Sequence, residues 1–361
     1  MRIRWLITSA LLAVIVMISG GSAFHPKAAV STLEATAAPT QAISATPTLT
    51  AQQIVALPEV QGDILGVHDP SMIKAGGKYY IFSTGAGILI HCSDDMLTWK
   101  SCGWIFPVNP FWLKVAVPGV GDLWAPDISF FAGKYHVYYA ASTFGSNHSI
   151  IGLLTNVTLD QADPNYKWID EKQVITSDRG DNFNAIDPNL VIDSSGQTWL
   201  AFGSFWDGIK MRKINAATGK LATDDTTLYS LAKNTLPPYP IEGAYITHRG
   251  KYYYLFVSYD FCCRGVKSNY KIMVGRSASV TGPYVDQDGK PMLEGNATLV
   301  YKGSERWRGP GHNAIFVEND TYWMLYHSYD AEHNGTPTLR IEALQWDGED
   351  WPYSLNAVLG R

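Results

Sequence analysis

The stretch VHDPSMIKAGGKYYIFS, residues 67–83, reads as a polar turn, a short apolar strand, a Gly-Gly turn and an aromatic strand. Two such strands around a tight glycine turn are the signature of a β-hairpin. Four later stretches repeat the same phrase: WAPDISFFAGKYHVYYAAS from Trp124, IDPNLVIDSSGQTWLAFGS from Ile186, EGAYITHRGKYYYLFVS from Glu242 and GHNAIFVENDTYWMLYHS from Gly311. The chain is therefore predicted to contain five equivalent hairpins.

Each hairpin carries a polar or ionisable residue near the start of its first strand. In copies one, four and five this residue lies ten positions before an aromatic residue of the second strand. The spacing is eight positions in copy two and twelve in copy three. In chain order, the residues are Asp69, Asp127, Asp187, Glu242 and His312. The repeated placement indicates that these side chains occupy related positions in the fold.

The repeat predicts an all-β fold, a five-bladed β-propeller formed by residues 58–361. Second-strand aromatic residues recur every 53 to 70 residues, which is longer than a solenoid repeat and suits a four-stranded blade with long loops. Because first strands line the central channel of a propeller, Asp69, Asp187, Glu242 and His312 are expected to converge at one mouth. One alternative is that each Asp merely caps a turn, and another is that the hairpins form a β-sandwich. Neither alternative accounts for one sequence pattern that is repeated five times.

The N-terminal region predicts export from the cell. Residues 1–23 combine a basic start, an apolar run and small residues, which is typical of a secretory signal cleaved after Ala23. The apolar run is short for a membrane span, so no span is expected after signal removal. Residues 24–57, rich in Ala, Thr, Ser and Pro, are expected to form a disordered linker. The mature protein is expected to be secreted, either free or tethered to the cell envelope.

Composition narrows the class of partner. The formal net charge is −5, and no basic patch interleaves with aromatic residues, so nucleic acid is not expected as a partner. The chain contains 12 Trp and 20 Tyr. Flat aromatic rings stack on sugar faces, although most of these residues are expected to form the core of the blades. The pattern favours a monomeric protein that binds a polysaccharide.

Four cysteines give two candidate disulfides. Cys92 and Cys102 flank a probable hairpin turn, and export permits them to pair across it. Cys262 and Cys263 are adjacent, so they either form a vicinal disulfide or remain buried thiols. The spacing of the four residues does not match a zinc site.

The carboxylates of the repeat are the only catalytic constellation in the sequence. Hydrolysis of a glycosidic bond takes two carboxyl groups, one ionised and one protonated, whose pKa values are separated by their environments. Glu242 lies between Ile241 and Gly243, and this apolar flank favours a raised pKa and an acid role. Asp69 is the candidate base, and Asp187 is a third carboxylate of the same ring. No Ser-His-Asp motif, nucleophile elbow, phosphate loop or H-E-x-x-H motif occurs.

Seven short motifs carry a family resemblance. They are VHDPS (67–71), WAPDI (124–128), NAIDP (184–188), GSFWDGI (203–209), IEGAY (241–245), FCCRG (261–265) and GPGHN (309–313). Together they resemble the arabinanases of glycoside hydrolase family 43, and NAIDP, GSFWDGI and FCCRG resemble endo-acting members most. The resemblance extends over residues 58–361. It implies a five-bladed β-propeller, in agreement with the repeat count, and hydrolysis with inversion at the anomeric carbon.

The resemblance also implies roles for individual residues. It makes Asp69 the general base, Glu242 the general acid, and Asp187 the group that tunes the pKa of the acid and orients it. A wider set would contact the sugar: Asp69, Trp124, Asn184, Ala185, Ile186, Asp187, Ser204, Phe205 and Trp206. His312 corresponds to a histidine that holds a cation, often calcium, in the channel. Calcium prefers oxygen ligands, so water would have to complete its shell; the alternative is a neutral histidine hydrogen-bonded to the carboxylates.

Three hypotheses for the function follow. The first is an endo-acting hydrolase of α-1,5-linked arabinan, a plant cell-wall polysaccharide. The second is an exo-acting α-L-arabinofuranosidase or β-xylosidase on the same scaffold; an open groove favours the first and a blocked pocket the second. The third is a catalytically silent sugar-binding propeller, which would have no use for the three carboxylates.

Overall fold

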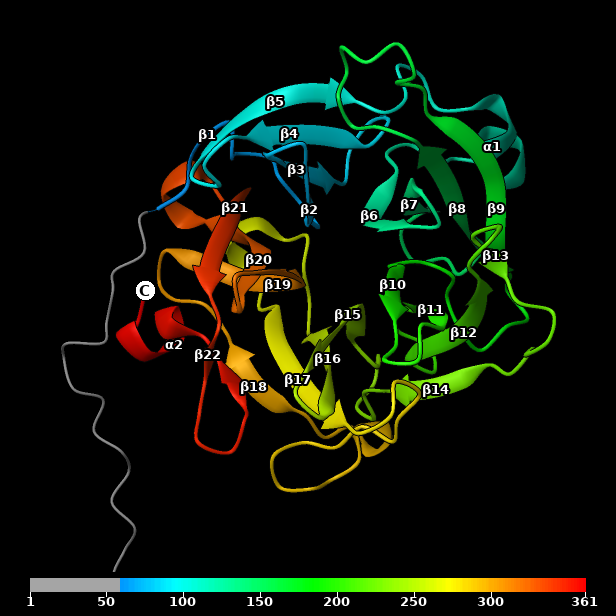
Figure 1. The fold of residues 1–361 in the computed structure, drawn as a ribbon. Coiled ribbons are helices and arrows are strands. Elements are labelled where there is room, and N and C mark those ends of the chain that lie inside the picture. Colours follow the sequence, from blue (N-terminus) through cyan, green and yellow to red (C-terminus); the bar gives the residue numbers. More distant parts are fainter. Residues whose placement is uncertain (1–58) are drawn as a thin grey trace, which may run out of the picture. The chain divides into compact units, whose positions relative to one another are not determined.

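The computed structural model describes residues 59–361, and five of their β-sheets are arranged as blades around a common axis (Figure 1). The predicted all-β, five-bladed propeller is confirmed. The predicted signal peptide, residues 1–23, and the linker, residues 24–57, lie outside the described residues. Among the residues that are described, no helix has the length and apolar character to cross a membrane.

The blades follow one another along the chain. Blade one contains β1 (Gln61–Gly62), β2 (Ser71–Ala75), β3 (Lys78–Ser83), β4 (Leu89–Ser93) and β5 (Thr98–Trp104). Blade two contains β6 (Trp124–Phe131), β7 (Lys134–Ala141), β8 (Ser149–Asn156) and β9 (Ile169–Ser177). Blade three contains β10 (Asn189–Ile192), β11 (Thr198–Phe202), β12 (Ile209–Asn215), β13 (Lys220–Leu221) and β14 (Tyr229–Ala232). Blade four contains β15 (Ile241–Arg249), β16 (Tyr252–Tyr259), β17 (Lys271–Ser277) and β18 (Thr298–Tyr301). Blade five contains β19 (Trp307–Glu318), β20 (Thr321–Asp330) and β21 (Thr336–Ala343).

Smaller elements join or flank the blades. The hairpin of β22 (Gln345–Trp346) and β23 (Pro352–Tyr353) follows blade five. Within residues 59–361, the two α-helices are short: α1 (Phe111–Ala116) and α2 (Leu355–Leu359). Single 3-10 turns are η2 (Gly265–Lys267), η3 (Met292–Glu294) and η4 (Ala331–His333).

The ring closes between blades five and one. The innermost strands contact one another in the cyclic order β2, β6, β10, β15, β19 and back to β2. Blade five has three strands, and the segment from Ile64 to Gly66 runs antiparallel beside β21. Gly66 N donates to Pro337 O at 2.7 Å, and Leu339 N donates to Ile64 O at 3.0 Å. The N-terminal end of the domain therefore supplies the missing outer pairing of the last blade.

The hydrophobic core lies between the blades. The buried apolar residues form five clusters, and each cluster draws its members from two neighbouring blades. Trp99 and Ile81 of blade one, for example, pack with Leu325 and Leu339 of blade five. Because both faces of a blade are buried in this way, strands such as β8 are buried along their whole length, and exposure does not alternate. The close packing of sheet on sheet fixes where each inner strand begins.

The structure corrects the alignment of the five copies. The equivalent positions all adopt left-handed backbone, with φ of 46–59°: Asp69, Ala125, Asp187, Gly243 and His312. Copy two therefore places Ala125 where Asp127 was expected, and copy four places Gly243 where Glu242 was expected. In both cases the alignment matched the nearest acidic residue, because the type of a residue can be read from the sequence, whereas its backbone conformation cannot.

Asp127 instead belongs to a second ring, two residues further along each first strand. We call the four polar members of that ring, Ser71, Asp127, Asn189 and Tyr245, the inter-blade ring. Each side chain binds the backbone of the next blade: Ser71 Oγ accepts from Ile128 N at 3.1 Å, Asp127 Oδ2 from Leu190 N at 2.8 Å and Asn189 Oδ1 from Ile246 N at 2.8 Å, while Tyr245 OH donates to Ile315 O at 3.0 Å. Blade five has Ala314 at this position, and there the Ile64–Gly66 segment joins the two blades instead.

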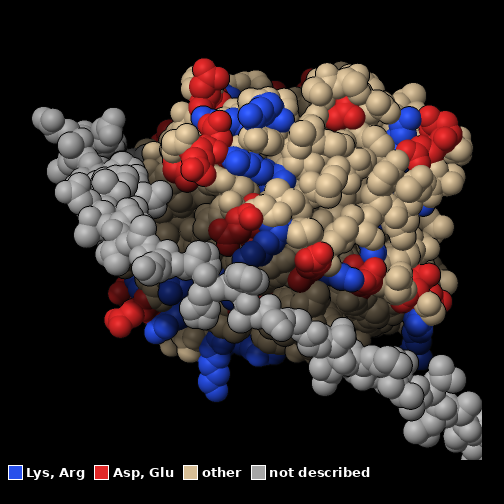
Figure 2. Space-filling view, turned by 90° about the horizontal axis from the view of Figure 1, so that it is seen from below, with Lys and Arg blue, Asp and Glu red and all other residues tan. Residues whose placement is uncertain are grey.

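Both candidate disulfides are present. Cys92 is linked to Cys102 across β4 and β5, and Cys262 is linked to Cys263 in the loop after β16. The vicinal pairing is therefore confirmed over the alternative of two buried thiols. On the face shown in Figure 2, basic and acidic side chains are interspersed. Ion pairs occur on the described surface, such as Lys213 with Asp224 at 2.8 Å.

Candidate active site

The starts of the inner strands surround a cavity of about 450 Å³. Asp69, Asp187, Glu242 and His312 all line it, so the predicted convergence of these four residues is what the structure shows. We call these four residues the mouth ring. Asp69, Asp187 and His312 have left-handed backbone, which is uncommon for residues other than glycine and tends to occur at functional sites.

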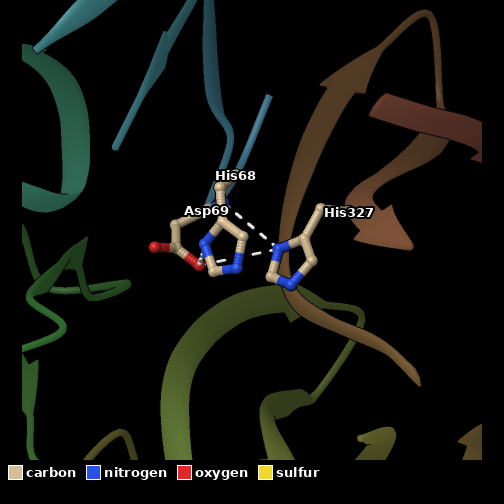
Figure 3. A group of neighbouring side chains, drawn as sticks. All are labelled: His68, Asp69 and His327. Atoms are coloured by element: carbon tan, nitrogen blue, oxygen red, sulfur yellow. Dashed lines mark hydrogen bonds and ion pairs between the residues drawn. The ribbon is translucent and has the colours of Figure 1, made fainter. Parts of the chain in front are cut away.

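Three imidazole rings surround one oxygen of Asp69. His68 Nδ1, His312 Nδ1 and His327 Nδ1 lie 2.8, 3.1 and 3.5 Å from Asp69 Oδ1, and Figure 3 shows His68 and His327 beside the carboxylate. The other oxygen, Oδ2, accepts a hydrogen bond from Thr84 Oγ1 at 2.6 Å. Burial alone would raise the pKa of Asp69, but the nearby His312 and His68 outweigh it and hold that pKa well below its usual range. Asp69 is therefore ionised at neutral pH.

Glu242 is held at both carboxyl oxygens. Ser204 Oγ donates to Oε2 at 2.6 Å, and Tyr270 OH donates to Oε1 at 2.9 Å. Asp187 lies next to it, since Asp187 Oδ2 accepts a hydrogen bond from Gly243 N at 3.1 Å. Burial raises the pKa of Asp187 well above its usual range, and the neighbouring charges of Glu242 and Asp69 raise it further. The raised pKa favours the protonated form of Asp187, and this carboxyl lies directly beside Glu242.

Most of the predicted sugar contacts line the same cavity. They are Trp124, Asn184, Ile186, Ser204, Phe205 and Trp206, in addition to Asp69 and Asp187. Ala185 is placed differently, because it is fully buried in the core cluster between blades two and three and does not line the cavity. The residue precedes Ile186 in the same turn, and a turn directs successive side chains to different sides.

Several further residues line the cavity that the sequence patterns did not indicate. They are His68, Thr84, Thr143, Phe144, Gly145, Ser146, Phe261, Cys262, Cys263, Arg264 and Tyr270. Phe144 is 80% exposed and packs on Trp124, with ring centroids 5.0 Å apart. Across the ring, Arg264 stacks on Phe261 at 4.1 Å. The FCCRG motif was visible in the sequence, but it gave no indication that its loop reaches the cavity.

A metal ion fits this site only in a restricted way. His68, Asp69 and His327 offer ligand atoms within 4.8 Å of one another. However, the two imidazoles are stacked, with centroids 3.7 Å apart and planes 22° from parallel, so their in-plane lone pairs cannot meet at one ion. His312 directs Nδ1 to Asp69, which leaves its Nε2 for a ligand. Because calcium takes six to eight oxygen ligands, a calcium ion at His312 would need a shell made mainly of water.

Comparison with known proteins identifies the family. Residues 64–352 match Glycosyl hydrolases family 43. The chain is 43% identical to the extracellular endo-α-(1→5)-L-arabinanase 1 of Bacillus subtilis, covering 79% of this chain and 87% of that protein. It is 41% identical to the extracellular exo-α-(1→5)-L-arabinofuranosidase ArbA of Cellvibrio japonicus, covering 79% and 85%.

Solved structures agree with this relationship. The α-L-arabinanase of Cellvibrio cellulosa in complex with arabinohexaose superposes with a TM-score of 0.78 at 40% identity, covering 81% of this chain and 96% of that one. The family 43 endo-arabinanase of Bacillus licheniformis gives a TM-score of 0.77 at 44% identity, covering 82% and 100%. The chain is a glycosidase that belongs to glycosyl hydrolase family 43.

Proposed function

We propose that this glycosidase cleaves internal α-1,5-L-arabinofuranosidic bonds of arabinan with inversion of configuration. The observation that carries the proposal is the contrast between its carboxyls. Asp69 is held ionised by imidazoles, whereas burial and the nearby carboxylates raise the pKa of Asp187, which lies beside Glu242. One ionised and one protonated carboxyl facing a single cavity are what glycoside hydrolysis requires.

Asp69 is assigned the role of general base. Thr84 Oγ1 accepts from Ala125 N at 2.8 Å, so its own proton is directed to Asp69 Oδ2. This contact fixes the plane of the carboxylate. The ionised oxygen can then take a proton from a water molecule as that water attacks the anomeric carbon.

Glu242 is assigned the role of general acid, with Asp187 as its modulator. The hydroxyls of Ser204 and Tyr270 fix the two oxygens of Glu242. The acid role requires a proton on Glu242 when the substrate is bound, so that it can pass to the departing sugar oxygen. The expectation that the pKa of Glu242 itself is raised remains a prediction.

Aromatic residues on two sides of the cavity favour cleavage inside a chain. Trp124 and Phe144 belong to blade two, whereas Phe261 follows the second strand of blade four. Because blades two and four are not neighbours in the ring, sugar units could stack on both sides of the cleavage point. Relatives include both endo- and exo-acting enzymes, so an exo-acting arabinofuranosidase is the second candidate. The proposal of an extracellular location follows the predicted signal and the extracellular relatives.

We further propose that His312 holds a hydrated cation, with calcium as the first candidate. The ion would be electrostatic or structural in effect, and no chemical step is assigned to it. Exhaustive chelation followed by assay and thermal melting tests this role. A lower activity or melting temperature with unchanged products is expected, and full activity and stability of the ion-free protein would contradict it.

The product profile on linear arabinan tests the proposed function. An endo-acting enzyme should release a ladder of oligomers and lower the viscosity of the solution before much reducing sugar appears. Release of a single short product from chain ends, with little early loss of viscosity, would favour the exo-acting alternative. Turnover of an aryl xyloside but not of arabinan would favour a β-xylosidase, and a protein without turnover on any substrate would be a sugar-binding module.

A further inference from the structure

The loop that carries the vicinal disulfide has no role in the mechanism above. It follows β16 and includes two residues with left-handed backbone, Asp260 at φ 69° and Cys263 at φ 64°. Cys262 and Cys263 both line the cavity, and Cys263 is exposed there. The bond between adjacent side chains closes a small ring that restricts the backbone of this loop, so the direction of the Cys263 N–H is fixed.

That N–H group is aimed at a buried tyrosine of blade five. Cys263 N donates to Tyr329 OH at 2.7 Å, and Tyr329 OH lies 2.8 Å from His68 Nε2. Burial raises the pKa of Tyr329, so the hydroxyl keeps its proton. A hydroxyl has one proton, and since it accepts from Cys263 N, it donates that proton to His68 Nε2. The competing acceptor, Cys263 Sγ, is a weak one and lies 3.8 Å away.

This hydrogen bond decides the tautomer of His68. If Nε2 accepts, the neutral imidazole carries its proton on Nδ1, the nitrogen that lies 2.8 Å from Asp69 Oδ1. The contact is electrostatic, since Nδ1 is not aligned for a hydrogen bond. The ring is also stacked on His327, with centroids 3.7 Å apart, which limits its rotation (Figure 3). With the opposite tautomer, a lone pair would face the carboxylate and repel it.

We propose that the Cys262–Cys263 loop and Tyr329 are positioning elements for the general base, which act by holding His68 as the tautomer that presents Nδ1–H to Asp69. The chain of contacts runs from blade four through blade five to blade one, across the seam of the propeller. The inference rests on the proposed role of Asp69. The activity should therefore depend on the redox state of the loop. A dithiol reductant would supply two electrons and two protons, leave Cys262 and Cys263 as two thiols, and itself become a cyclic disulfide. The loop would then lose its restraint.

The Tyr329→Phe variant tests the central contact. It removes the hydroxyl and keeps the ring that packs beside His68 and His327. The expected result is a fall in kcat of about tenfold with KM changed less than twofold, because a hydrogen bond to the base assembly is lost and no substrate contact is removed. Tyr253→Phe, in β16, is the matched control, since this hydroxyl is outside the cavity and bonds Ser194 in the β10–β11 turn of blade three. This control should keep the kcat of the unaltered protein.

The two disulfides allow a second comparison. C262S/C263S should lower kcat by a factor similar to that of Tyr329→Phe, and the combined variant should lose little more, because both changes break one chain of contacts. C92S/C102S, in blade one, should leave kcat unchanged. In the C92S/C102S protein, dithiothreitol can reduce only the vicinal disulfide, and kcat should fall on reduction and return on reoxidation.

The direct readout is nitrogen NMR of the His68 ring, assigned with a His68→Gln variant. The unaltered protein should show a protonated Nδ1 and an unprotonated Nε2, and Tyr329→Phe should show a mixture of tautomers. A His68 ring with its proton on Nε2, or an unchanged kcat in either Tyr329→Phe or folded C262S/C263S, would overturn the inference. A protein that does not cleave arabinan would instead overturn the proposed function, while the tautomer of His68 would still test the contacts described here.

Discussion

In blades one, three and four, a member of the mouth ring lies only two or three residues before a member of the inter-blade ring. Asp69 and Asp127 illustrate the contrast, because both are buried aspartates at the start of an inner strand. Asp69 faces the cavity, and imidazoles hold its pKa low. Asp127 faces the next blade and accepts hydrogen bonds from Leu190 N and Asn189 Nδ2, while burial raises its pKa to about 7.

The difference shows how one repeat supplies both chemistry and cohesion. At the mouth, the side chains face the cavity, so their chemistry is free to vary between blades, as Asp69, Glu242 and His312 show. In the inter-blade ring, every member must reach the neighbouring backbone, so its chemistry can vary only among groups that accept or donate a hydrogen bond. Changes in the first ring should therefore affect catalysis, and changes in the second should affect stability.

The largest effect is expected for Asp69→Asn. The amide cannot take a proton, so kcat should fall by about 10²–10⁴-fold on every substrate. Thr84 and the histidines can still contact an amide of the same size, so the melting temperature should change little. Steady-state kinetics and thermal melting measure the two quantities. Near-normal activity in the folded variant would remove Asp69 from the mechanism.

Glu242→Gln should show a loss that depends on the substrate. On arabinan, kcat should fall by a factor similar to that for Asp69→Asn, because the departing sugar oxygen needs a proton. On an aryl arabinoside with a good leaving group, the loss should be much smaller, because that group departs without protonation. An equal loss of activity on both substrates would contradict the acid role. Asp69→Asn serves as the control, since it should lose as much on either one.

Asp127→Ala should have the opposite signature. The change leaves Leu190 N without its partner in a buried interface and removes the acceptor used by Ser71 and Asn189. The free energy of unfolding should fall by about 2–4 kcal/mol, as measured with denaturant. Activity per folded molecule should stay within a few-fold of the unaltered protein. A strong loss of kcat without a loss of stability would break the distinction between the two rings.

The same residue predicts a dependence of stability on pH. The pKa of Asp127 is about 7 in the folded protein and about 3.9 in an unfolded chain. Between these values the folded state binds one more proton, so stability should decrease as pH rises from about 4 to 7, by up to roughly 1.4 kcal/mol per pH unit. Asp127→Asn has no proton to lose. The difference in free energy of unfolding between the two proteins should therefore shift with pH in favour of Asp127→Asn, and a constant difference would contradict the raised pKa.

The sequence was sufficient for the architecture and for most of the mouth ring. Five copies of one hairpin phrase predicted five blades, and the placement of Asp69, Asp187 and His312 followed from it. Glu242 was identified correctly as a lining residue, but its alignment was off by one position, because Gly243 carries the shared backbone conformation. A left-handed backbone is not visible in a sequence where Asp, Ala, Gly and His all adopt it.

The repeat pattern could not predict which residues contact the carboxylates. Tyr270, Tyr329 and His327 come from second and third strands or the loops beside them, where each looks like one more aromatic residue of a blade core. Phe144 lies in a loop without a pattern. The roles of these residues depend on which blades are neighbours and on the direction of side chains across the interface between them. The residue spacing within one hairpin predicts neither property.

The stereochemistry of the first product tests the central claim most directly. Asp69 and Glu242 belong to blades one and four, and side chains from different blades are expected to leave room for a water molecule, at the separation of ~6.5–9.5 Å typical of inverting enzymes. Proton NMR of a fresh reaction with an α-linked substrate should therefore show β-arabinofuranose first. An initial α product, or a glycosyl group trapped on Asp69, would contradict the assignment of Asp69 as a base.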